Sequence, residues 1–124
     1  MKLQADKLDG LVVSGLGPGW IAVNGEKKTA SILLSSRGLC LDWPCSRFED
    51  LTPSHFAQLD ALDAELVLFG SGARLRFPPP QWLQGLMQRH IGLETMDTAA
   101  ACRTYNILAS EGRHVVAALL VEQA

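Results

Sequence analysis

Residues 91–121 read IGLETMDTAAACRTYNILASEGRHVVAALLV, and this stretch decides the fold. Its pattern predicts a short strand over 93–96 and then a helix over 98–111 that Gly112 ends. The unbroken apolar run over 115–121 is typical of a strand that is covered on both faces. Strand, helix and strand joined by short links predict a parallel βαβ unit with a right-handed crossover.

The residues before this stretch add another strand and helix to the same unit. A brief apolar run over 66–69 predicts a strand, and Gly70-Ser71-Gly72 ends it. Pro80 then starts a helix that Gly92 ends. Its apolar positions are expected to share one face: Leu83, Leu86, Met87 and Ile91. We therefore expect three parallel strands at 66–69, 93–96 and 115–121.

The N-terminal half has a different texture. Asn24-Gly25 lies between the strand-like residues 20–23 and 29–34, which predicts a hairpin with a type I′ turn. A further strand is expected over 39–43. Together these residues predict an antiparallel meander.

Between the two halves, Thr52 as N-cap and Pro53 at the first helical position predict a short helix. The fold class is therefore mixed α/β, with N-terminal antiparallel hairpins joined to a C-terminal parallel βαβαβ unit. We expect residues 1–124 to form a single domain, because this length can close one hydrophobic core.

Composition limits the kinds of partner and compartment. A net charge of -2 provides no basic field for phosphate backbones, so we expect no nucleic-acid partner. No apolar run reaches membrane-spanning length, and the N-terminal MKLQADKLDG has no apolar h-region of a secretory signal. Three cysteines, an odd number, are more typical of reduced thiols than of a disulfide framework. A cytoplasmic protein is the resulting expectation.

The topology indicates where a site should lie. Ligands of open sheets with parallel strands bind outside the carboxyl ends of the strands, where loops and helix N-termini meet. If strands 66–69 and 93–96 are neighbours, the loops that follow them lie side by side. Arg74, Arg76 and Arg103 would then border one pocket and, with the first N–H groups of the helix, hold an anion. The candidate binding residues are Gly70, Ser71, Gly72, Arg74, Asp97, Thr98, Arg103 and Asn106.

Catalytic and cofactor sites have weaker support. Cys102 follows the start of the helix, where the dipole favours a thiolate, so it is a weak candidate nucleophile. The alanines over 99–101 indicate close packing and favour a buried structural thiol instead. The segment over 70–75, GSGARL, lacks the third glycine of a dinucleotide fingerprint. No histidine spacing resembles a ligand pair, so we expect neither metal nor cofactor.

Several blocks of this sequence resemble one known family. They are GPGWIAVNG over 17–25, FEDLTPSHFAQL over 48–59, ELVLFGSGARLRFPPP over 65–80 and IGLETMDTAAACRTYNILASEGRHVVAALL over 91–120. They resemble the family called domain of unknown function four-nine-eight, which includes a mitochondrial assembly factor of respiratory complex I. The resemblance implies a three-layer α/β domain, no established active site, and a protein partner in respiratory-complex assembly.

Two functions follow from these observations. The first is a non-catalytic interaction module, an assembly-factor-like protein, whose exposed surface surrounds the Gly70 and Asp97 loops and includes Trp82 or Trp43. The alternative is a small-molecule anion-binding protein or a thiol enzyme with its site at the same strand ends.

Overall fold

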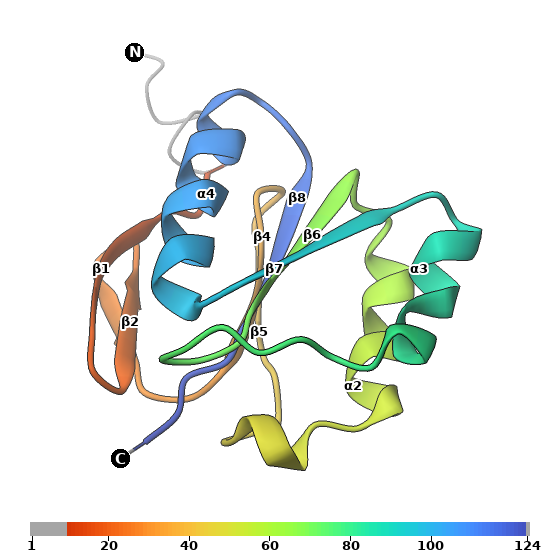
Figure 1. Ribbon diagram of the computed structural model, residues 1–124. Helices are drawn as coiled ribbons and strands as arrows, with labels where there is room; N and C mark the ends of the chain where they lie inside the picture. The colour runs from red at the N-terminus through yellow and green to blue at the C-terminus, as the bar shows by residue number, and fades with distance from the viewer. Residues whose placement is uncertain (1–9, 124) are drawn as a thin grey trace.

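A central sheet of five strands organises the computed structural model, which describes residues 10–123 (Figure 1). The strand order is β5-β4-β8-β6-β7. The strands are β4 (Ile32–Ser35), β5 (Leu39–Asp42), β6 (Leu66–Gly70), β7 (Gly92–Met96) and β8 (Val115–Leu119). Strand β6 pairs in parallel with both β7 and β8, so the predicted parallel unit is confirmed.

A second, smaller sheet contains β1 (Val13–Gly17), β2 (Trp20–Val23) and β3 (Glu26–Lys28). The predicted turn between β2 and β3 is confirmed, because Asn24 and Gly25 both have positive φ, at 48° and 86°. The predicted partner of residues 20–23 is wrong. Strand β3 ends at Lys28, and β4 leaves this sheet to pair with β5 and β8. All four residues of β4 are buried, and a strand with two buried faces needs a place inside a covered sheet.

The helical segments flank the central sheet. They are η1 (Phe48–Asp50), α2 (Pro53–Ala57), η2 (Gln58–Leu62), η3 (Pro80–Leu83), α3 (Gln84–Gln88) and α4 (Thr98–Ser110), with η marking 3-10 helices. Helix α4 and the small sheet lie on one side of the central sheet, and α2 and α3 lie on the other (Figure 1). No helix within residues 10–123 is long and apolar enough to cross a bilayer.

Successive side chains of β6 and β8 point to opposite faces of the central sheet, so a hydrophobic core forms on each face. On the α4 side lie Leu68, Val115, Ala117 and Leu119. On the α2 and α3 side lie Val67, Phe69, Val116 and Ala118. The central sheet is therefore covered on both faces, which confirms the predicted three-layer α/β architecture.

The helix predicted after Pro80 differs from expectation. It is divided into η3 and α3, it ends at Gln88, and Gly92 starts β7 rather than ending the helix. Leu86 and Ile91 are buried, but Met87 is 67% exposed. A 3-10 segment has about three residues per turn instead of 3.6, so it shifts which side chains of the following turns face the core.

Candidate functional site

The loops that follow β6 and β7 meet at one corner of the molecule, because the two strands are parallel neighbours. Ser71 N donates to Met96 O over 2.9 Å, and Thr98 N donates to Gly72 O over 2.9 Å. Gly72 N donates in turn to the Thr98 hydroxyl over 2.9 Å. The structure thus brings Gly70, Ser71, Gly72, Asp97 and Thr98 together.

The polar groups of this corner are already used within the protein. The Ser71 side chain is fully buried, and its hydroxyl donates to Arg74 O over 2.8 Å and accepts from Arg76 N over 3.0 Å. The Thr98 hydroxyl donates to Leu120 O over 2.7 Å. A Cβ on Gly70 would lie 3.0 Å from the Thr98 Cα, so this close approach favours glycine. The corner is a closed, hydrogen-bonded junction.

An ion pair attaches the C-terminal segment to this junction. Arg76 Nη2 lies 2.5 Å from Glu122 Oε1 and donates to Ser71 O over 2.7 Å. The other carboxylate oxygen of Glu122 accepts from Phe48 N over 2.9 Å. Gly72 has a φ of +102°, and a Cβ there would overlap the Glu122 carboxylate. Arg76, considered above as a border of an anion pocket, therefore joins three segments of the fold.

An apolar cavity of about 340 Å³ lies beside the junction, between the strand ends and the β1–β2 hairpin. We call it the hairpin groove. Its hairpin side is formed by residues 16–21, and its other side by Gly72, Ala73, Asp97, Thr98, Ala99, Leu120, Val121 and Glu122. Leu16, which is 40% exposed, lies at the hairpin side of the groove. The lining therefore offers mainly apolar side chains and backbone to a ligand.

Helix α4 holds the hairpin in place. The Asn106 side chain accepts from Val13 N and donates to Val13 O, both over 2.9 Å. The Tyr105 hydroxyl donates to Leu11 O over 2.6 Å, and burial raises the pKa of this phenol. At the other end of the hairpin, Gln123 Nε2 donates to Gly19 O over 2.9 Å. Asn106 thus positions one wall of the groove rather than lining it.

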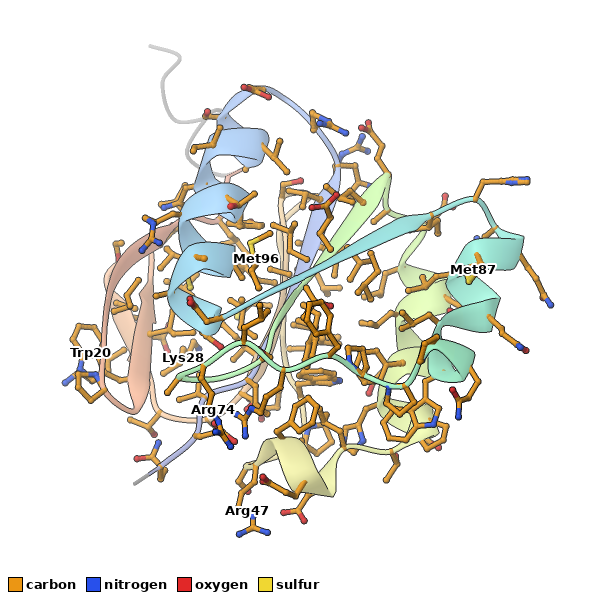
Figure 2. The ribbon with its side chains drawn as sticks, viewed as in Figure 1. Trp20, Lys28, Arg47, Arg74, Met87 and Met96 are labelled. Atoms are coloured by element: carbon orange, nitrogen blue, oxygen red, sulfur yellow. The ribbon has the colours of Figure 1, made fainter. Side chains whose placement is uncertain are left out.

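The two arginines expected to seat an anion do not reach the groove. Arg74 lies on the loop after β6 (Figure 2), and Arg103 lies on α4. Both side chains are exposed, and neither lines the cavity. The charged side chains in the lining are the carboxylates of Asp97 and Glu122. Asp97 Oδ1 also accepts from Ala100 N over 2.8 Å, so the helix N-terminus already has an anionic cap. This arrangement disfavours an anionic ligand in the groove.

Cys102 points into the core on the α4 side of the sheet and is 1% exposed. Burial raises the pKa of its thiol to about 12, against a smaller lowering by the charge of Arg103. A thiol that is neutral and shielded from water is a poor nucleophile. The interpretation of Cys102 as a structural thiol agrees with this placement.

Trp43 and Trp82, which were expected on the exposed binding surface, lie on the α2 and α3 side of the sheet. The expectation for Trp43 is wrong: it is 1% exposed, and its ring packs edge-on against Phe56 and Phe69. The segment after β5 turns this side chain under α2, where the indole Nε1 donates to His55 O over 3.3 Å. Trp82 is half-buried and packs against Phe56.

The hairpin wall was not predicted as part of a site. The sequence feature that could have indicated it is the run GLGPGW over 15–20, which combines glycines with apolar residues. In the structure, Leu16 and Pro18 of this run are exposed. Within residues 10–123, no group of three His, Cys, Asp or Glu side chains is arranged to hold a metal ion.

Comparison with known proteins shows the family to which this chain belongs. A family profile described as "Protein of unknown function (DUF498/DUF598)" matches residues 13–120. An uncharacterised protein of Rhodobacter capsulatus is 36% identical over 112 residues, which cover 89% of this chain and 84% of that protein. The Bos taurus protein named NADH dehydrogenase (ubiquinone) 1 alpha subcomplex assembly factor 3 is 33% identical over 100 residues, or 79% of this chain. The matched region spans only 54% of that bovine protein.

A solved structure supports the fold. The crystal structure of a Bordetella parapertussis protein matches with a TM-score of 0.84 at 39% identity, covering 90% of this chain and 96% of that one. The arrangement of the layers is therefore shared with an experimentally determined relative.

Proposed function

Because this chain belongs to the family of proteins of unknown function DUF498/DUF598, we propose that it acts as a non-catalytic binding protein in the assembly of respiratory complex I. The name of its bovine relative, an assembly factor of NADH dehydrogenase, supports this role. The chain matches about half of that relative, and we propose that residues 1–124 form a single domain that carries the partner-binding role. A cytoplasmic location is part of the same proposal.

The observation that carries the proposal is the apolar hairpin groove at the ends of the parallel strands. Its small residues, Gly72, Ala73 and Ala99, allow a partner backbone to approach closely, and Leu16 offers apolar surface. We propose that the occupant is a partner segment with an apolar side chain next to a basic residue, because the carboxylate of Asp97 lies in the lining. The proposed binding surface therefore combines Gly72, Asp97 and Thr98 with the hairpin, and the buried Gly70 and Ser71 support it from within the fold.

No observation favours the alternative of an anion-binding protein or thiol enzyme over this role. The cavity lacks Arg74 and Arg103, and Cys102 is buried away from it. Asn106 supports the hairpin wall, so its proposed contribution to binding is indirect.

Deletion of the gene in its native host tests the proposal. We expect less assembled complex I on native gels, with subassemblies accumulating, and recovery with the wild-type gene. Ala99→Arg, which fills the groove, should fail to restore assembly. Ala57→Arg is the matched control, since Ala57 is exposed on α2 at the opposite face of the sheet, and it should restore assembly fully.

Normal levels of complex I in the deletion strain would contradict the assembly role. Equal recovery with both arginine variants, each shown to be folded by circular dichroism, would instead contradict the assignment of the groove. The first result tests the role in complex I assembly, and the second tests whether the groove is the surface that carries it.

A further inference from the structure

Strand β7 forms one edge of the central sheet. Met96 O accepts from Ser71 N on the β6 side, and backbone groups of a strand alternate in direction, so residues 92, 94 and 96 bond toward β6. Leu93 and Thr95 therefore direct their N–H and C=O groups outward. Within residues 10–123, no backbone partner from another element occupies this outer edge. Two donors and two acceptors are thus available to an added strand.

The side chains of β7 divide between the two faces of the sheet. Glu94 is paired in register with Leu68, whose side chain belongs to the α4-side core, so Glu94 points to that side. Leu93 packs on the opposite core, next to α3. On α3, Met87 is 67% exposed and lies toward the end at which β7 begins (Figure 2). The edge therefore has an acidic side and an apolar side.

The negative charge of Glu94 determines which kind of strand can pair with the edge of β7. Glu94 is exposed and forms no ion pair with the described part of the chain. A second copy paired antiparallel about Glu94 would place two carboxylates opposite each other, which is unfavourable. A strand that places a lysine or arginine opposite Glu94 would form a favourable cross-strand pair instead.

We propose that β7 is a docking edge for an extended segment of a partner protein, in which a basic residue faces Glu94 and the residues on either side of it are apolar. The segment extends the central sheet by one strand and bonds to the backbone of Leu93 and Thr95. Its apolar residues lie on the α3 side, beside Leu93 and Met87. This edge is separate from the hairpin groove, so it adds a second binding surface whose existence does not depend on the first.

A peptide titration followed by NMR tests the proposal. The probe is acetyl-Thr-Val-Lys-Val-Thr-amide, and the matched probe replaces its lysine with glutamate. We expect the lysine peptide to shift the amide signals of Leu93 and Thr95 and to slow their hydrogen exchange. Glu94→Lys should weaken binding of the lysine peptide by about two- to fivefold and favour the glutamate peptide.

Glu111→Lys is the matched control variant. Glu111 is exposed at the C-terminal end of α4, away from β7, so the substitution makes the same change of charge outside the proposed edge. It should leave the affinities for both peptides unchanged.

Several results would overturn the proposal. Unchanged amide signals at Leu93 and Thr95 with millimolar lysine peptide would exclude a docking edge for this chemistry. Peptide-induced shifts confined to the hairpin groove would assign the binding elsewhere. Protection of Leu93 and Thr95 that grows with protein concentration, without peptide, would show that a second copy occupies the edge. If Glu94→Lys changed the affinities for the lysine and glutamate peptides equally, the segment would not be recognised through a basic residue opposite Glu94.

Discussion

Cys102 shows how burial outweighs position at the scale of a single residue. A helix N-terminus stabilises a nearby anion by about 0.3–1 kcal/mol, which is less than one pKa unit. Burial acts in the opposite direction and raises the pKa of the Cys102 thiol from 9.0 to about 12. The alanines over 99–101 indicated this outcome in the sequence, because small side chains allow the helix to pack closely on the sheet.

This shift predicts a dependence of stability on alkaline pH. Between pH 9 and 12 the unfolded chain releases the Cys102 proton and the folded protein retains it, so the free energy of unfolding falls as pH rises. The contribution is about 1.4 kcal/mol per pH unit at most. In urea unfolding between pH 8 and 10.5 with a reductant present, Cys102→Ala should therefore show a shallower fall than wild type.

Cys45→Ala provides the comparison, since Cys45 is only half-buried. The Tyr105 phenol, whose pKa burial also raises, is present in all three proteins, so it does not affect the difference between them. Identical slopes for wild type and Cys102→Ala would contradict the burial of an un-ionised thiol.

At the scale of elements, one side chain joins α4 to the hairpin. Asn106→Ala would leave Val13 N–H and C=O without their side-chain partners, at a cost of about 2–3 kcal/mol. We expect faster hydrogen exchange across β1 and β2, with little change in β6 and β8. Asn106→Asp keeps the acceptor for Val13 N but places a carboxylate oxygen against Val13 O in place of the donor, so it should also lose stability. Uniformly faster exchange in both sheets would show that Asn106 supports the whole fold rather than the hairpin.

The parallel unit was predictable because its signals are local. Gly70 ends β6, Asp97 caps α4, and β8 is continuously apolar. The partner of β2 was not predictable from the same signals. Asn24-Gly25 specifies the turn but not how far the returning strand continues. The position of β4 in the central sheet depends instead on tertiary packing, because both of its faces are buried.

At the scale of the molecule, the groove joins segments that are distant in the sequence. The strand-end corner followed from topology, since parallel neighbours end together. The hairpin wall did not, because it depends on contacts between β1 and α4 that are 93 residues apart in the chain. The directions of Arg74 and Arg103 likewise depend on loop geometry and helix rotation, which a sequence pattern does not specify.

The central claim is that the hairpin groove contacts proteins of complex I assembly. Photo-crosslinking tests it most directly, with benzoylphenylalanine placed at Leu16, on the hairpin side of the groove, or at Ala57, on the opposite face. In cells assembling the complex, we expect crosslinks from position 16 to complex I subunits or their assembly factors, and none of these from position 57. The absence of such crosslinks at position 16, or the same products from both positions, would contradict this claim.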